Sequence, residues 1–155
     1  MFQHEIKDLY SAETQLIEAL PKMAKAASHK SLQEAFENHL AETKQQQQRL
    51  VKVAEHLGFD PKGETCNAME GLIEEGEEMV EMDAESDVKD AGLIASAQRV
   101  EHYEIAGYGT AVTFAQMLGH REAEQLLQET LKEEKNADGK LNKLAESKIN
   151  RDAMS

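Results

Sequence analysis

The sequence predicts an all-α fold in which four long helices form a bundle, and three observations support this prediction. The chain of 155 residues is rich in Ala, Glu, Leu, Lys and Gln and contains two prolines, a composition that favours helices. Apolar residues recur at alternating steps of three and four along four segments, which places them on one face of each helix. The register of the first two segments returns 91 residues later in the last two, so that Glu13 corresponds to Glu104. We therefore expect an internally repeated pair of helical hairpins.

The first hairpin is expected to contain helices at about 2–27 and 31–58. The apolar face of its first helix consists of Phe2, Ile6, Leu9, Glu13, Leu16, Leu20, Met23 and Ala27. Pro21 lies within this segment and is expected to bend or interrupt the helix, because proline cannot donate a backbone hydrogen bond. Ser31 is the expected N-cap of the second helix, and Gly58 is its expected end. The short turn between the helices makes them antiparallel neighbours.

The second hairpin is expected to contain helices at about 87–118 and 121–148. The connection between the hairpins, 64–86, is too long for a tight turn and long enough for a crossover with a short helix of its own. Two antiparallel hairpins joined by a long crossover form the topology of ferritin-like bundles. We expect one such domain at 1–150, followed by a frayed tail at 151–155 that has no apolar pattern.

Charge and cysteine content exclude several classes of function. The net charge is −13, which argues against nucleic acid as a partner, because binding to phosphates needs clustered cations. No segment has the length and apolarity of a membrane span, and the start of the chain, MFQHEIKDLY, lacks the apolar run of a signal peptide. The single cysteine, Cys66, cannot form an internal disulfide. We expect a cytoplasmic protein.

Acidic residues interrupt the apolar faces near the middle of the helices. Glu13 and Glu104 lie close to the centres of their faces, and Glu134 lies close to the centre of the last one. Glu42 lies at the edge of the second face, and Glu101 lies one turn before Glu104. An unpaired buried carboxylate costs several kcal/mol. These side chains therefore need a compensating partner.

Two assignments in this polar layer stay open. The periodicity of the last helix favours Glu134, whereas the repeat favours Glu133, which corresponds to Glu42. His39 lies on the inner face of the second helix, three residues before Glu42. It is interpreted as a core histidine bonded to a neighbouring carboxylate, with direct metal ligation as the alternative.

Several carboxylates in one cavity cannot all stay ionised unless cations lie between them. Oxygen ligands on facing helices suit two divalent ions, Fe or Mn. The sequence thus predicts a carboxylate-rich dinuclear site and identifies no catalytic residue within it. The candidate ligands are Glu13, His39, Glu42, Glu101, Glu104, Glu133 and Glu134.

The chain resembles the YciE/YciF family of stress-associated bacterial ferritin-like proteins. The segments that carry the resemblance are Asp8–Glu13, His39–Thr43, Ala68–Glu75, Val100–Ala106 and Leu131–Lys135. The resemblance spans nearly the whole chain and implies a ferritin-like fold, a dinuclear metal centre and a homodimer. One departure concerns the Glu-x-x-His motif that ferritins and rubrerythrins usually carry on their second and fourth helices. The equivalent positions here, Glu42–Gln45 and Glu133–Asn136, lack the histidine, which gives an all-oxygen site, shifts metal preference toward manganese, weakens affinity or leaves an inactive site.

Two functions from different classes follow. The first is a dinuclear iron or manganese protein that binds redox metal and reacts with dioxygen or peroxide during oxidative or envelope stress. The second is a non-catalytic helical scaffold with a metal-free polar core, in which the acids are protonated or bonded to neighbouring side chains. The candidate neighbours are His39, Thr43, Gln46 and Thr130.

Overall fold

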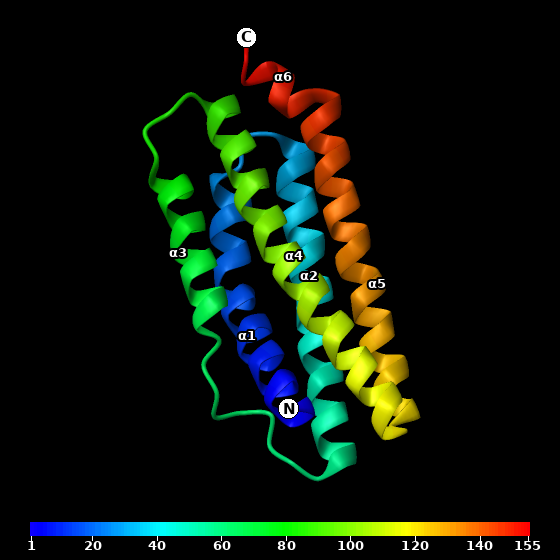
Figure 1. Ribbon diagram of the computed structural model, residues 1–155. Helices are drawn as coiled ribbons and strands as arrows, with labels where there is room; N and C mark the ends of the chain where they lie inside the picture. Colours follow the sequence, from blue (N-terminus) through cyan, green and yellow to red (C-terminus); the bar gives the residue numbers. More distant parts are fainter.

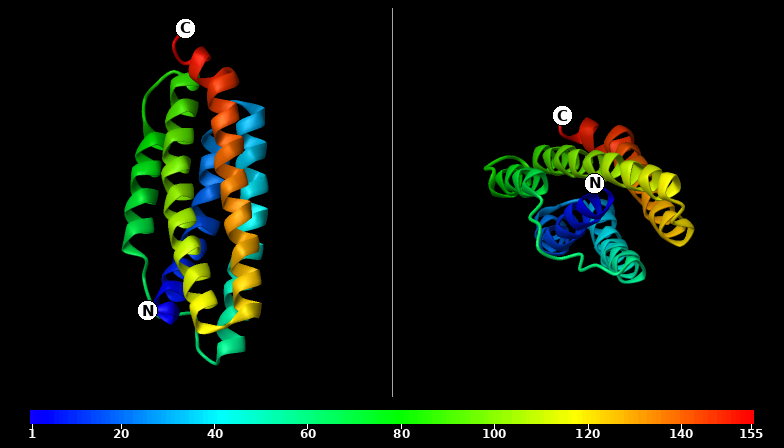
Figure 2. Two further views of the ribbon diagram at one scale, coloured as in Figure 1. Left: turned by 45° about the vertical axis from the view of Figure 1, so that its right-hand side comes forward. Right: turned by 60° about the horizontal axis from the view of Figure 1, so that its bottom comes forward.

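The computed structural model describes residues 1–155, and its long helices form an antiparallel bundle (Figure 1). The helices are α1 Phe2–Ala26, α2 Lys30–Leu57, α3 Asn67–Glu81, α4 Ser86–Leu118, α5 Arg121–Leu144, η1 Ala145–Ile149 and α6 Asn150–Asp152. Helices α1, α2, α4 and α5 make up the bundle, and the crossover helix α3 packs outside it against α1 and α4 (Figure 2). The predicted all-α bundle of two hairpins with a helical crossover is confirmed.

Two glycines end the second helix of the first hairpin and the first helix of the second hairpin. Gly58 has φ of 75° after α2, and Gly119 has φ of 74° after α4. Both values lie in the left-handed region, which side chains with a Cβ avoid. These positions let the chain leave α2 for the crossover and turn tightly from α4 into α5.

The start of α2 differs from the prediction. Ser31 is not the N-cap, because α2 already begins at Lys30 after His29. The buried carboxylate of Asp90 on α4 instead accepts hydrogen bonds from the backbone N–H groups of Ser28 (2.8 Å) and His29 (2.7 Å). A side chain from the other hairpin therefore satisfies the backbone donors of this turn, an arrangement that local sequence does not reveal.

Pro21 does not interrupt α1, which is continuous from Phe2 to Ala26. The proline is exposed, so water can satisfy the carbonyl that loses its intrahelical partner.

At the other end of the chain, α5 is shorter than the expected helix at 121–148. It continues through the π-helical turn η1 into α6, so the backbone is helical up to Asp152.

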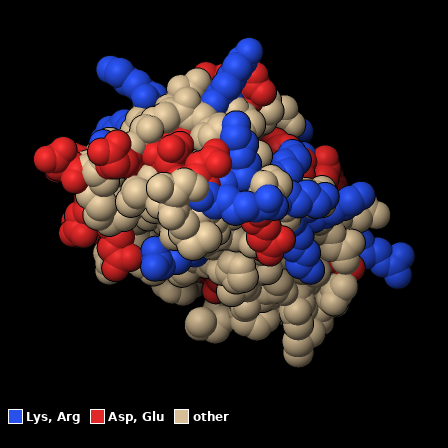
Figure 3. All heavy atoms as spheres, turned by 90° about the horizontal axis from the view of Figure 1, so that it is seen from above, with Lys and Arg blue, Asp and Glu red and all other residues tan.

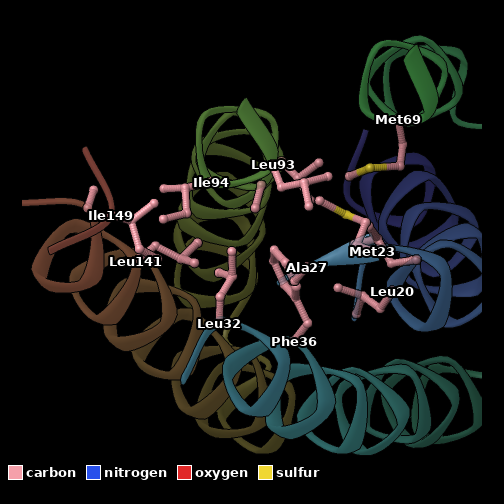
Figure 4. Packing of buried hydrophobic residues seen from close by; sticks show 14 of the residues in the cluster. Leu20, Met23, Ala27, Leu32, Phe36, Met69, Leu93, Ile94, Leu141 and Ile149 are labelled. Carbon is pink, nitrogen blue, oxygen red and sulfur yellow. The ribbon is translucent and has the colours of Figure 1, made fainter. Parts of the chain in front are cut away.

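The apolar core is divided into two clusters at opposite ends of the bundle. The upper cluster lies toward the C-terminus as drawn in Figure 1, and Figure 4 shows several of its side chains, including Leu20 from α1, Phe36 from α2 and Leu141 from α5. The lower cluster lies toward the N-terminus and includes Ile6 and Leu50. The polar side chains of the next section lie between these two clusters.

Gly107 lies where α4 packs tightly against Leu9 of α1. A Cβ at this position would lie 2.8 Å from Cδ2 of Leu9, which is closer than carbon atoms can pack. The missing side chain lets α4 press against α1 beside the buried acids Glu104 and Glu13.

Candidate metal centre

The long helices bring five ionisable side chains into the middle of the bundle. These side chains are Glu13 from α1, His39 from α2, Glu101 and Glu104 from α4, and Glu134 from α5. The four glutamates are at most 2% exposed and His39 is 7% exposed. Helical periodicity places them there, because each lies on the inward face of its helix together with the apolar core residues.

Four of these residues form a compact group. One ligand atom from each of His39, Glu101, Glu104 and Glu134 can be chosen so that all lie within 4.8 Å of one another. Nε2 of His39 lies 3.0 Å from Oε1 of Glu101 and 4.0 Å from Oε2 of Glu134. One imidazole and three carboxylates therefore surround a volume that a cation could occupy.

Glu13 completes the layer from the side of α1. Its Oε1 accepts a hydrogen bond from the phenolic hydroxyl of Tyr108, which is itself fully buried. Its Oε2 has no hydrogen-bond partner. The tyrosine thus fixes one oxygen of Glu13 and leaves the other free to bind a ligand.

Most polar atoms of the layer are buried and lack partners. The unpaired atoms are Oε2 of Glu13, Oε2 of Glu101, and both carboxylate oxygens of Glu104 and of Glu134, whereas the ring nitrogens of His39 have only the nearby acids Glu101, Glu42 and Glu134 as ion-pair partners. Native interiors normally pair nearly all such atoms, because a buried polar group without a partner is costly. The cluster is therefore incomplete without protons, water or cations.

Burial raises the pKa values of the innermost acids. The pKa of Glu13 is raised to about 8, although the hydrogen bond from Tyr108 favours its charged form. Burial, reinforced by the neighbouring charge of Glu13, holds the pKa of Glu104 well above its usual range. Burial also raises the pKa of Glu134 well above its usual range. Without cations, these side chains favour their protonated forms near neutral pH.

The pKa of His39 is raised even though its side chain is buried. Burial disfavours the imidazolium, but the neighbouring acids Glu101, Glu42 and Glu134 together outweigh this effect and hold the pKa of His39 well above its usual range. Glu42 reaches the same histidine from the outer side, with Oε2 3.8 Å from Nδ1. The pKa of Glu42 is lowered, chiefly by its interaction with His39.

The structure does not bring Glu42 and Glu133 into the compact group. The side chain of Glu42 is 33% exposed and lies at the edge of the layer, beside His39. Glu133 turns away from the layer and binds Arg49, with distances of 2.7 and 2.8 Å to the guanidinium. Of the two alternatives on the last helix, Glu134 lies inside the layer, in agreement with helical periodicity rather than with the repeat.

Arg49 is a buried residue that the sequence analysis did not single out. Its guanidinium bridges α2 to α5 by binding Glu133, Glu129 and the hydroxyl of Thr130. Gln46 donates a further hydrogen bond to Glu133 at 3.0 Å. Only the position of Arg49, next to Leu50 on the inner face, could have indicated this role.

The threonine hydroxyls and the amide of Gln46 do not satisfy the buried acids. Thr43 donates to the carbonyl of His39, and Thr130 donates to the carbonyl of Leu126. Gln46 is committed to Glu133. Of the four neighbours considered for a metal-free core, only His39 approaches acids of the compact group.

A second polar group lies between the crossover and the bundle. The hydroxyl of Tyr103 donates to Asp8 at 2.5 Å and lies 3.1 Å from Sγ of Cys66. Cys66 also accepts from the N–H of Met69 and thereby caps α3. Burial raises the pKa of the Cys66 thiol, so the cysteine is a poor nucleophile and fixes the start of α3.

The donor set fits divalent iron or manganese. Carboxylate oxygens with one imidazole suit both ions, and facing helices of a bundle can hold two of them. The histidine precedes Glu42 by three residues, whereas the Glu-x-x-His motif places it three residues after the acid.

No helix combines the length and the apolar character needed to cross a lipid bilayer.

Comparison with known proteins identifies relatives over nearly the full chain. Residues 1–154 match the family described as a domain of unknown function, DUF892. Protein YciF of Escherichia coli is 50% identical over 154 residues, covering 99% of this chain and 93% of YciF.

Solved structures of three proteins share the fold. The crystal structure of the E. coli stress protein YciF has a TM-score of 0.93 and 51% identity, covering 96% of this chain and 94% of that chain. YcfI from Rhodopseudomonas palustris, whose description suggests a structural role, has a TM-score of 0.87 and 44% identity over 91% of this chain and 90% of its own. A protein from Xanthomonas campestris shares the fold with a TM-score of 0.77 at 21% identity, over 94% of this chain and 90% of its own.

Proposed function

Since this chain belongs to the YciE/YciF family of stress proteins, DUF892, we propose that it is a stress protein that holds two divalent Fe or Mn ions in its polar layer. The proposed ligands are Glu13, His39, Glu101, Glu104 and Glu134. Glu42 lies close enough to His39 to orient it or to join the ligands. Glu133 acts outside the layer through its ion pair with Arg49.

The observation that carries this proposal is the set of buried oxygen and nitrogen atoms without partners. Both oxygens of Glu104 and of Glu134 are buried in the polar layer without a hydrogen-bond partner, and the nearest positive group to Glu134 is Nε2 of His39 at 4.0 Å. Evolution of a merely structural core would favour apolar side chains here, because replacing buried charges by apolar groups is often stabilising. Divalent cations satisfy these oxygens and remove the repulsion between their charges.

The surrounding residues control geometry and access. Tyr108 holds one oxygen of Glu13 and prevents its rotation. The lower cluster closes the layer from below with the buried side chains of Ile6 and Leu50, which exclude water. When bound, an Fe or Mn pair supplies one-electron chemistry toward dioxygen or peroxide. That chemistry fits a role in oxidative or envelope stress.

A second candidate function is a metal-free structural protein. The raised pKa values of Glu13, Glu104 and Glu134 favour it, because protonated acids avoid charge repulsion without a metal. The description of the R. palustris relative points the same way. The clustering of His39, Glu101, Glu104 and Glu134 favours the metal site instead, because one ligand atom from each lies within 4.8 Å of the others, as metal ligands do.

Metal analysis separates the two functions. The protein is purified without chelator, loaded anaerobically with Fe(II) or with Mn(II), desalted and analysed for metal content. We expect about two ions per chain, as in dinuclear bundle sites, and their loss in a Glu13→Ala plus Glu104→Ala double variant. The matched control removes two exposed acids, Glu37→Ala plus Glu146→Ala, and retains the ions. A wild-type protein that holds no metal after loading would establish the structural alternative.

The reaction is tested separately from binding. Peroxide or dioxygen is added to the Fe(II)-loaded protein, and the absorbance of ferric species is followed with time. We propose that the loaded protein turns over, works in the cytoplasm and forms a homodimer, as the family resemblance implies. Cell fractionation and analytical ultracentrifugation test the last two points.

A further inference from the structure

A cavity of about 370 Å³ opens between α2 and α5 in the upper half of the bundle. Its inner wall is largely apolar and includes Leu20, Phe36 and Leu141, and its deepest polar residues are His39 and Glu101. Protein interiors rarely leave voids much larger than a water molecule. A cavity of this size with an apolar wall and few polar groups has the character of a site for a small organic ligand.

The internal repeat shows that this opening is specific to one half of the bundle. Advancing 91 residues takes Arg49 to Lys140 and Glu42 to Glu133. In the lower half, Arg49 is buried and binds Glu133 at 2.7 Å, which closes the space between α2 and α5. In the upper half, the equivalent pair of Lys140 and Glu42 is 4.0 Å apart, and the side chain of Lys140 is 60% exposed. The ion pair that closes the space between α2 and α5 in the lower half is therefore longer and more exposed in the upper half.

Neighbouring positions of the repeat also differ between the closed lower half and the open upper half. Gln46, which donates to Glu133 in the closed half, corresponds to Ala137 in the wall of the cavity. His39 faces the cavity, whereas its repeat counterpart is Thr130. The residues that depart from the repeat therefore open a path and place an imidazole at its end.

Two lysines line the mouth of the cavity together with two acids, Glu34 and Glu42. Lys140 and Lys143 lie at the rim on α5. Lys140 lies 4.0 Å from Glu42, and Glu34 on the opposite rim pairs with Lys30. Lys143 has no ion pair. Lys and Arg side chains also gather in the middle of this end of the molecule, seen from above in Figure 3, although the net charge of the chain is −13.

We propose that this cavity binds an amphipathic organic carboxylate, with its aliphatic part inside the apolar wall and its carboxylate at Lys143 and Lys140. The inference deepens the proposed function and rests on it for one point, that the bound molecule lies next to the metal ions as a substrate or modulator. The binding site itself exists without metal, because side chains of the bundle helices form the cavity and Lys140 and Lys143 of α5 lie at its rim.

Titration of the chelator-treated protein with decanoate tests the inference. Isothermal titration calorimetry is expected to give saturable binding to one site per chain, at least about tenfold weaker for decylammonium, whose charge is repelled by the rim. Ala35→Phe fills the mouth and abolishes binding. Its repeat counterpart, Leu126→Phe on the closed half, retains binding. Lys143→Glu weakens the binding of decanoate by about tenfold or more, whereas its repeat counterpart Lys52→Glu leaves the binding unchanged.

The outcomes separate the ligand site from the metal site. If the wild type binds no decanoate, or if Ala35→Phe and Lys143→Glu bind it as well as the wild type does, the inference is overturned, whatever the metal content. If circular dichroism shows that Ala35→Phe is unfolded, the test depends on decanoate binding by Lys143→Glu compared with Lys52→Glu. If decanoate binds at this cavity and Fe and Mn loading both fail, the proposed function falls and the ligand site stands.

Discussion

Tyr108 on α4 donates a hydrogen bond to Oε1 of Glu13 on α1, and both residues are fully buried. The pair links the two hairpins at the level of the polar layer. It also fixes the direction of the second oxygen of Glu13, which has no partner within the chain.

Tyr108→Phe removes this bond and leaves both oxygens of Glu13 unpaired. We expect a loss of about 1–3 kcal/mol in the free energy of unfolding, the range for a buried partner left unsatisfied, and weaker binding of Fe or Mn. Urea denaturation and metal titration measure the two effects. Tyr10→Phe is the control, because its half-buried hydroxyl makes no side-chain hydrogen bond. Equal stability of the two variants would show that the Tyr108 bond contributes nothing.

Glu104→Leu is expected to separate stability from metal binding. Both oxygens of Glu104 are buried without partners, so an apolar side chain of similar size should stabilise the metal-free protein by about 1–3 kcal/mol. The same change removes a proposed ligand and should lower metal content. Thermal unfolding in chelator, combined with metal analysis, reports both. A variant that is less stable than the metal-free wild type would mean that the carboxyl group has a partner in solution.

The pH dependence of stability has a defined sign in the metal-free protein. The pKa of Glu13 is about 8 in the fold, against 4.5 in the unfolded chain. The folded state therefore keeps a proton that the unfolded state releases, and stability falls as pH rises from about 5 to about 8. The raised pKa of His39 acts in the same direction. Urea denaturation in chelator at several pH values should show this decline, and Glu13→Gln should reduce it.

Bound Fe or Mn is expected to reverse this trend. Cations bind the deprotonated carboxylates, so the stability gained from metal should grow as pH rises over the same range. The comparison is made by repeating the denaturation series with Mn(II) in place of chelator. Identical curves with and without Mn(II) would argue against a metal site in the polar layer.

Arg49 and Lys140 occupy equivalent positions of the repeat but should differ in their contribution to stability. Arg49→Ala leaves Glu133 without its guanidinium partner in a largely buried setting, and we expect a loss of about 2–3 kcal/mol. Lys140→Ala removes only a long, exposed contact with Glu42 and should change stability by less than about 0.5 kcal/mol. Chemical denaturation of both variants makes the comparison. Similar losses would contradict the difference between the closed and open halves.

The sequence could predict the directions of side chains on single helices, because helical periodicity alone determines them. This is why Glu13, Glu104 and Glu134 lie inside the bundle as expected. Interactions between helices could not be predicted in the same way. Arg49 binds Glu133, which lies 84 residues further along the chain. Asp90, which lies 61 residues after His29, takes the role at the start of α2 expected of Ser31. Both depend on the relative position of the two hairpins, which no local pattern encodes.

Gly107 and Gly109 provide a matched test of the close packing between α1 and α4. Both lie within α4, but a Cβ at Gly107 would meet Leu9 at 2.8 Å, whereas a Cβ at Gly109 would meet nothing within 4 Å. Gly109→Ala should stabilise the protein by about 0.5–1 kcal/mol, because alanine favours the helix. Gly107→Ala gains the same helical preference but must displace the fully buried Leu9, and overpacking costs about 1–3 kcal/mol. Thermal unfolding should therefore raise the Tm of the first variant and lower that of the second. Because Gly107 lies between Glu104 and Tyr108, its substitution should also weaken metal binding, and an unchanged metal affinity would show that the layer tolerates separation of the two helices.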